Sequence, residues 1–152
     1  MAVRLETLVP PPIVAACFAA GMLGLAWVAP ALTFPIPSAL AYPVAAVGVS
    51  LDAVALFHFL RSRTTINPLK PGSASTLVTG GIYRVTRNPM YLGLATLLLA
   101  WAIYLGNLAA LAGVPVFILY MNGFQVAAEE RALEARFGAE YAAYRARVRR
   151  WL

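Results

Sequence analysis

Residues 91–128, YLGLATLLLAWAIYLGNLAALAGVPVFILYMNGFQVAA, carry no charged side chain. An apolar run of this length is typical of membrane-spanning helices, because about 20 residues of helix cross the hydrocarbon layer. Gly106 and Asn107 divide the run and are residue types that form tight turns between antiparallel helices. We therefore expect two membrane helices, at residues 89–105 and 108–128. The first is only about 25 Å long, so we expect it to be tilted, re-entrant or set in a thinned bilayer.

The rest of the chain has the same apolar character. Of its 152 residues, 61% are hydrophobic and only 12% are charged, whereas roughly a quarter of a soluble domain is charged. A second uncharged run, residues 7–51, begins a region that predicts two further spans, at about 13–33 and 40–60. The first span is long for a signal peptide and lacks a cleavage context, so we expect it to be retained. We predict an all-α integral membrane bundle of four transmembrane helices, forming one domain over residues 1–152.

The positive charges predict the topology. All twelve Lys and Arg residues lie in the N-terminal segment, in residues 61–88 or in residues 129–152. With four spans, these three segments share one side of the membrane, which the positive-inside rule makes cytoplasmic. We therefore expect a multi-pass protein of the inner (cytoplasmic) membrane with both termini in the cytoplasm. The net charge of +6 then reflects topology, since no nucleic-acid-binding motif accompanies it. Cys17 is the only cysteine, so no disulfide framework is expected.

Residues 129–150 predict a different kind of helix. Apolar residues recur in it at steps of three and four, with arginines around them: Leu133, Phe137, Tyr141, Tyr144, Val148 and Trp151. A basic amphipathic helix of this kind lies at a membrane surface or caps a bundle. We expect it on the cytoplasmic side, and Gly138 is expected to divide it into two pieces.

Two features of the spans concern helix shape and packing. Pro115 predicts a kink in the fourth span. In the first span, small residues recur every four positions and form a smooth ridge that favours close helix packing: Ala16, Ala20 and Gly24. The ridge offers a contact face for another copy of the chain, and the oligomeric state stays open.

Two polar residues lie inside the second predicted span. Asp52 is far from its ends, where a bare carboxylate costs about 2.5–3.5 kcal/mol. We expect it to face the bundle interior, either in a structural hydrogen bond or in a substrate site. His58 lies about 120° away around the helix, so the two do not share a face. Because the chain has no other histidine, we expect no metal site and favour an interfacial role for His58.

Residues 80–93, GGIYRVTRNPMYLG, gather polar chemistry between the second and third spans. Asn88 as N-cap and Pro89 in the first turn predict the start of a helix. The N–H groups and the positive dipole at such a start attract carboxylates and phosphates. Arg84 and Arg87 strengthen that preference for an anion.

The remaining residues of this segment suit a ligand with a ring. Gly80 and Gly81 allow the backbone to approach a ligand closely, and Tyr83 and Tyr91 offer flat surfaces for a ring or a cation. Lysines or scattered arginines would suffice for a loop that only sets the topology. The pattern therefore favours a site for an anionic, ring-bearing ligand.

The run LVTGGIYRVTRNPMYLG, residues 77–93, resembles the signature of the isoprenylcysteine carboxyl methyltransferase family and its phospholipid N-methyltransferase relatives. In that signature, Gly-x-Tyr-Arg leads to Arg-His/Asn-Pro-x-Tyr-x-Gly, and a Glu-Glu pair and a Phe-Gly-x-x-Tyr-x-x-Tyr tail follow a helical hairpin. The matching residues here are Gly81, Tyr83, Arg84, Arg87, Asn88, Pro89, Tyr91, Gly93, Glu129, Glu130, Phe137, Gly138, Tyr141 and Tyr144. TTINP at 64–68 resembles the Thr-x-x-Pro element often found before the signature. The resemblance covers roughly residues 45–150.

Two positions depart from the isoprenylcysteine enzymes. Asn88 stands where they carry His, and Ile82 replaces a usual Pro. Asn at this position is similar to many bacterial relatives whose substrates are not prenylated proteins. The resemblance therefore implies the family's cofactor without implying a prenylcysteine substrate.

The resemblance implies a methyltransferase that uses S-adenosylmethionine and a lipophilic or lipid-like acceptor that enters from the bilayer. The cofactor carboxylate suits Arg87 and the helix start at Asn88 and Pro89, and its ammonium and ribose hydroxyls suit Glu129 and Glu130. The other residues implied to bind the cofactor are Leu77, Gly81, Tyr83 and Tyr91.

The implied chemistry depends on the acceptor. Arg87, Glu130 and Asp52 are the residues expected to act in catalysis. A carboxylate acceptor needs no general base, whereas an amine or a thiol must lose a proton, to Asp52 or to a glutamate. The sequence does not determine whether the acceptor is a carboxylate, an amine or a thiol.

Three other interpretations stay open. Glu129 and Glu130 could be solvated acids that neutralise nearby arginines, since surface ion pairs are common and weak. The chain could be a non-catalytic four-helix membrane protein that binds lipids or partners. It could also resemble longer membrane reductases that use NADPH, although it is short for that class.

Overall fold

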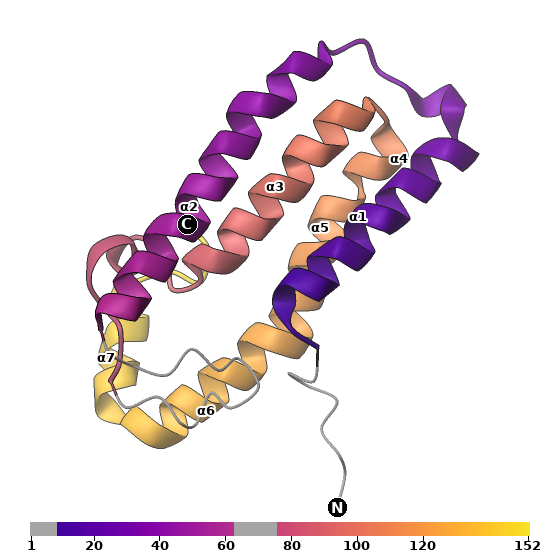
Figure 1. The fold of residues 1–152 in the computed structure, drawn as a ribbon. Coiled ribbons are helices and arrows are strands. Elements are labelled where there is room, and N and C mark those ends of the chain that lie inside the picture. Colours follow the sequence, from indigo (N-terminus) through magenta and orange to yellow (C-terminus); the bar gives the residue numbers. More distant parts are fainter. Residues whose placement is uncertain (1–8, 63–75) are drawn as a thin grey trace, which may run out of the picture.

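The computed structural model describes residues 9–62 and 76–152, and within them it contains helices and turns but no β-strand (Figure 1). Arg4, Arg63, Lys70 and the TTINP element at 64–68 lie outside the described residues. The main helices are α1 (Pro11–Val28), α2 (Ala41–Arg61), α3 (Pro89–Leu105), α4 (Leu108–Leu111), α5 (Gly113–Tyr120), α6 (Ala127–Phe137) and α7 (Ala139–Arg147). A π-helical segment, η5 (Met121–Val126), joins α5 to α6. Short 3₁₀ turns are η1 (Pro30–Leu32), η2 (Ser38–Leu40) and η4 (Gly81–Arg84).

The long helices alternate in direction, as expected for consecutive membrane spans (Figure 1). Three segments of the described chain are long and apolar enough to cross a membrane: Pro11–Val28, Ser38–Arg61 and Leu108–Phe137. The fourth, α3, is apolar but has only 17 residues. The all-helical bundle of apolar helices agrees with the prediction, and a full crossing by α3 stays a prediction.

The helix bounds differ from the predicted bounds of the first and last spans. The first helix ends at Val28, not near residue 33, because Pro30 opens the turn η1. The last apolar helix does not stop at residue 128 but continues through α6 to Phe137. The predicted division of the segment 129–150 at Gly138 is present, because the backbone turns there with a φ of 47° between α6 and α7. The chain leaves helical geometry at Val148.

The break expected at Pro115 occurs a few residues before it. Helix α4 ends at Leu111 and α5 begins at Gly113, so Pro115 sits in the first turn of α5. The proline ring would clash with the carbonyl four residues earlier and offers no N–H to it, and that carbonyl belongs to Leu111. The interruption therefore follows from the proline.

Close packing of α2 on α3 brings the second and third spans together (Figure 1). Gly48 makes this possible, because a Cβ there would lie 2.9 Å from Leu97 Cγ and 3.1 Å from the Gly93 carbonyl oxygen. On the other side of α3, a core forms with α1 and α5, in which Met22 packs over Gly113 and Phe18 meets the Phe117 ring edge-on. Helix α3 is thus the centre of the bundle.

At one end of the bundle the connections are uncharged. Gly106 ends α3 with a φ of 59°, and Asn107 caps α4 by accepting from the N–H groups of Ala109 and Ala110. Asn107 Nδ2 also donates to the Ala29 carbonyl at 2.8 Å. The predicted tight turn at Gly106 and Asn107 is therefore present, and it holds the loop after α1.

The opposite end collects the polar segments. There α2 ends, α3 begins, and α6 and α7 fold back toward the start of α3 (Figure 1). The arginines in the described part of the chain belong to these segments: Arg61, Arg84, Arg87, Arg131, Arg136, Arg145, Arg147, Arg149 and Arg150. We call this the charged end.

Candidate cofactor site at the charged end

The described part of the polar link between α2 and α3 contains the 3₁₀ turn Gly81–Arg84. Gly81 has a φ of 59°, a backbone conformation that favours glycine. The imidazole of His58, in α2, fills the space where a side chain at Gly81 would project. The close approach at Gly81 is therefore made to the chain's own histidine rather than to an open ligand surface.

Helix α3 starts as predicted, with Asn88 in the N-cap position and Pro89 as the first helical residue. The Asn88 side chain, however, makes no capping hydrogen bond. Its Nδ2 donates to the Arg150 carbonyl at 3.0 Å, and the Thr86 hydroxyl donates to the same carbonyl at 3.2 Å. Asn88 thus ties the start of α3 to the C-terminal tail and leaves the first-turn N–H groups of α3 uncapped by its side chain.

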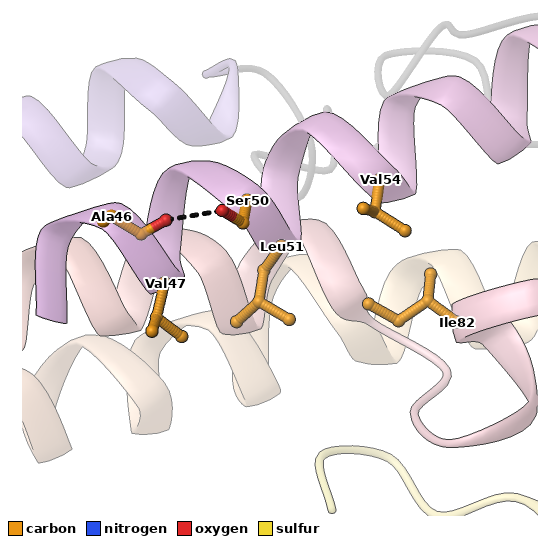
Figure 2. A pocket seen from close by; sticks show the side chains of 6 residues that line it. All are labelled: Ala46, Val47, Ser50, Leu51, Val54 and Ile82. Carbon is orange, nitrogen blue, oxygen red and sulfur yellow. Dashed lines mark hydrogen bonds between the residues drawn. The ribbon is translucent and has the colours of Figure 1, made fainter. Parts of the chain in front are cut away.

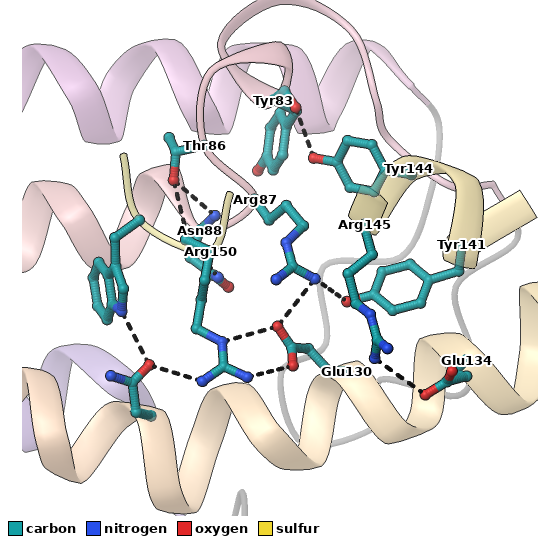
Figure 3. A network of polar contacts seen from close by, with 12 residues as sticks. Tyr83, Thr86, Arg87, Asn88, Glu130, Glu134, Tyr141, Tyr144, Arg145 and Arg150 are labelled. Carbon is teal, nitrogen blue, oxygen red and sulfur yellow. Dashed lines mark hydrogen bonds and ion pairs between the residues drawn. The ribbon is translucent and has the colours of Figure 1, made fainter. Parts of the chain in front are cut away.

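Two arginines from distant segments converge on Glu130 (Figure 3). Arg87 Nη1 lies 3.2 Å from Glu130 Oε1. Arg150 binds the same carboxylate through two atoms, Nη2 at 2.6 Å from Oε2 and Nε at 3.1 Å from Oε1. The Arg87 and Glu130 side chains are only 10% and 13% exposed, so solvent screens this pair less than it screens a surface pair. Hydrogen bonding to Glu130 raises the pKa of Arg150 further above its usual range.

Arg87 has a buried donor that none of the described residues binds. Its Nη1 also donates to the Tyr141 hydroxyl at 3.2 Å, but its Nε is buried and has no hydrogen-bond partner in the described part of the chain. A buried donor without a partner costs about 1–3 kcal/mol, and more when it is charged. An acceptor for this Nε is not found among residues 9–62 and 76–152, and a charged donor of this kind favours an anion.

Glu129 faces a different partner from its neighbour. Its Oε1 accepts from the Tyr91 hydroxyl of α3 and, at 3.2 Å, from Gln125 Nε2. Successive residues of an α-helix project about 100° apart, so Glu129 reaches α3 while Glu130 reaches Arg87. The π-helical turn before them widens the inward face, since both Gln125 and Val126 are buried. The acid pair therefore contributes to two adjoining contacts rather than one.

Aromatic residues of α7 close the site from the tail side. Tyr141, Tyr144 and Val148 form a buried cluster against which Leu77 packs, so Leu77 touches the apolar stripe predicted for this segment. The Tyr144 hydroxyl donates to the Tyr83 carbonyl at 2.7 Å. Burial raises the pKa of Tyr144 to about 12. The pKa of Tyr83 is also raised, first by burial and then by Tyr144 and Glu129.

Asp52 stands apart from these residues. Its carboxyl group packs on Gly93 of α3, and its Oδ1 is buried without a hydrogen-bond partner in the described part of the chain. Tyr91 and Gly93 are two residues apart and project about 200° apart on the helix. Asp52 therefore faces the bundle as predicted, but on the side of α3 away from Tyr91 and Glu129.

Two apolar grooves lie on the helices rather than among the charged residues. One, of about 310 Å³, runs along α2 beside the turn η4 and is lined by Ala46, Val47, Ser50, Leu51, Val54 and Ile82 (Figure 2). The other, of about 300 Å³, lies between α1 and α3 and is lined by Ala15, Ala16, Ala19, Leu94, Leu97, Leu98 and Trp101. Both surfaces suit hydrocarbon.

The structure thus brings Arg87 and Tyr91 together with Glu129 and Glu130, which follow about forty residues later in the sequence. Sequence reasoning missed Arg150, Asn122 and Gln125, which contact them or the tail. Asn122 and Gln125 are two of the few strongly polar residues in the last apolar run, so their polarity could have marked them as candidate site residues. Arg150 gave none, because it is one of several similar arginines near the C-terminus.

Comparison with known proteins bears on this arrangement. A family model described as phospholipid methyltransferase matches residues 37–140, more than half of the chain. An uncharacterized protein of Haemophilus influenzae is 56% identical over 63 residues, which make up 41% of this chain and all of that protein. No solved structure matches. The matched region includes the signature at 80–93 and the acid pair, and by this match the chain belongs to the phospholipid methyltransferase family.

Proposed function

We propose that the protein uses S-adenosylmethionine to methylate a small lipophilic or lipid-like acceptor. Its family is one of membrane methyltransferases, and the bundle offers apolar helices that suit a bilayer. The observation that carries the proposal is the meeting of Arg87, whose buried Nε has no partner among the described residues, with the acid pair at one end of the bundle. The anion-binding and cation-binding parts of a charged methyl donor's site are adjacent there.

The two acids have different roles in this proposal. Both oxygens of Glu130 already bind arginines, so Glu130 orients Arg87 toward the carboxylate of the cofactor. The first-turn N–H groups of α3 assist, because a helix start attracts anions. Glu129, held by Tyr91 and Gln125, is the acceptor for the ammonium or the ribose hydroxyls.

The remaining predicted residues frame the site. Asn88 and Pro89 define where α3 begins, and Gly81 and Tyr83 form the turn beneath it. Leu77 belongs to the cluster around Tyr144. In this proposal their side chains or backbone border the adenine and the sulfonium.

When bound, S-adenosylmethionine supplies an electrophilic methyl group on a positively charged sulfur. The protein's contribution is to align the methyl group with the acceptor and to exclude water. A carboxylate acceptor needs no base, whereas an amine or a thiol has to lose a proton. For such an acceptor, the proposed proton acceptor is Asp52 or a glutamate, and Asp52 can serve only an acceptor whose proton reaches the α2 side of α3.

The acceptor enters from the bilayer, and the apolar groove beside α2 and η4 is a surface along which a hydrocarbon chain fits (Figure 2). The excess of arginines at the charged end favours its placement in the cytoplasm. The protein is then a multi-pass protein of the cytoplasmic membrane in which the site opens toward the cytoplasmic pool of the cofactor.

Calorimetry on the detergent-purified protein tests the proposal. S-adenosylmethionine and its product S-adenosylhomocysteine are expected to bind, and NADPH is not. Arg87→Gln and Glu129→Gln are expected to weaken binding about tenfold or more, since each removes a charge-assisted contact. Arg147→Gln is the matched control, because that side chain is exposed and, among the described residues, its guanidinium bonds to the Ala143 carbonyl of its own helix. Equal affinity in all three variants would place the cofactor elsewhere, and binding of NADPH alone would favour a reductase.

A further inference from the structure

The last five residues of the chain form a non-helical tail that lies against the proposed cofactor site. Helix α7 ends at Arg147, and Val148 has extended backbone geometry. The tail then meets the link before α3 through three backbone-mediated hydrogen bonds. The Arg87 N–H donates to the Arg149 carbonyl at 3.0 Å, and Thr86 and Asn88 donate to the Arg150 carbonyl. The tail is therefore paired with the segment that carries the anion-binding residues.

A second set of contacts anchors the tail to the last apolar helix. Trp151 Nε1 donates to Asn122 Oδ1 at 3.0 Å, and Arg150 Nη1 lies 3.4 Å from the same oxygen. Trp151 also packs against the core formed by α1, α3 and α5. Asn122 belongs to the π-helical segment Met121–Val126. The tail thus bridges η5 and the start of α3.

Between these two anchors, Arg150 determines how Glu130 is held. Its guanidinium contacts both carboxylate oxygens, whereas Arg87 contacts only Oε1. A two-point guanidinium–carboxylate pair fixes the plane of the carboxylate as well as its position. Because Arg87 shares Oε1, the orientation of Arg87 depends on a carboxylate that Arg150 holds.

The geometry points to Arg150 as a further positioning residue of the cofactor site, carried there by the C-terminal tail. It acts through Glu130, by holding that carboxylate so that Arg87 presents its unpartnered Nε to the carboxylate of the methyl donor. This inference rests on the proposed function. It assigns a role to a segment that the residues of the signature do not include.

Binding of S-adenosylhomocysteine to detergent-purified variants, by calorimetry, tests the inference. Arg150→Gln is expected to weaken binding about tenfold, because it removes a charge-assisted contact. Arg147→Gln removes the same charge three residues earlier, from an exposed side chain, and is expected to bind like the unmodified protein. Arg150→Lys keeps the charge but not the two-point contact, so it is expected to fall between the two.

A double variant separates positioning from a general structural role. In a Glu130→Gln background, Arg150→Gln is expected to have less than about a twofold further effect on affinity, because the contact through which it acts is already lost. If Arg150→Gln does not fold, the comparison of Arg150→Lys with Arg147→Gln serves in its place.

The outcomes distinguish this inference from the function on which it depends. Failure of the unmodified protein to bind S-adenosylhomocysteine overturns both. Binding by the unmodified protein that Arg150→Gln and Arg150→Lys leave unchanged, or an equal loss in Arg147→Gln, overturns the role of Arg150 alone. A full additional loss in the Glu130→Gln background also overturns it, because Arg150 would then not act through Glu130.

Discussion

The ion pair between Arg87 and Glu130 yields the most direct test of the site geometry. The perturbation is a double-mutant cycle of Arg87→Gln, Glu130→Gln and the two together. Gln matches Glu in size and is an uncharged, hydrogen-bonding replacement for Arg that is shorter than the guanidinium side chain. The cycle measures whether the two side chains interact in the folded protein, independent of any ligand.

The structure sets the expected magnitude. The pair is separated by 3.2 Å, which at an effective dielectric constant of about 20 corresponds to a direct Coulomb term of roughly 5 kcal/mol. Desolvation offsets part of it, and a coupling energy of about 1.5–3 kcal/mol is expected for a close, mostly buried charge pair. Glu130→Gln should destabilise the fold by about 3–5 kcal/mol, because it leaves the mostly buried Arg87, and with it the partly exposed Arg150, without their carboxylate. Arg87→Gln should cost less, because Arg150 still pairs with Glu130.

Unfolding of the purified variants in mixed detergent micelles, followed by circular dichroism, provides the four free energies. The pair of Arg145 and Glu134 is the internal control. Its atoms are 3.6 Å apart and its side chains are 48% and 50% exposed, so a coupling of at most about 0.5 kcal/mol is expected. A coupling for Arg87 and Glu130 no larger than that of the control would refute the buried contact, and with it the arrangement of the site.

Three further outcomes are expected. Gly93→Ala should destabilise the fold by about 1–3 kcal/mol in detergent unfolding, because the new Cβ would overlap the Asp52 carboxyl group. Adding Asp52→Ala to this variant should restore most of the lost stability. If it restores none, Asp52 and Gly93 are not in contact. Gln125→Leu and Gln125→Glu should both weaken S-adenosylhomocysteine binding several-fold, because Glu129 loses a hydrogen-bond donor in both variants. Unchanged affinity in Gln125→Leu would count against Glu129 as a ligand. The folded pKa of Tyr144 is raised to about 12 from the ordinary value of 10.0, so the folded state holds a proton that the unfolded chain releases. The contribution of Tyr144 to stability is complete below pH 10 and is lost as the pH rises toward 12. The alkaline fall in stability should therefore be smaller in Tyr144→Phe. An identical pH dependence in the two proteins would contradict this expectation.

The sequence by itself was sufficient to predict the helical bundle and the end at which its chemistry gathers. Apolar runs such as 91–128 predict helices because unpaired backbone groups are costly in hydrocarbon, and this constraint acts locally. The bounds of α3 were predicted to the residue, 89–105, because Pro89 and Gly106 mark its two ends. The charge distribution and the signature at 80–93 likewise identified the polar link and the family.

Only the tertiary structure decided which partner each polar group takes. That Glu130 binds Arg87 and Arg150 while Glu129 binds Tyr91 depends on the direction in which each residue leaves α6 and on the path of the chain after Gly138. Asn88 was expected to cap its helix, but the returning tail offered the Arg150 carbonyl instead. Side-chain hydrogen bonds and ion pairs act only over a few ångströms, so residues about forty to sixty positions apart interact only once packing has placed them. The local pattern of a sequence therefore determines where polar groups are available, and the fold determines how they combine.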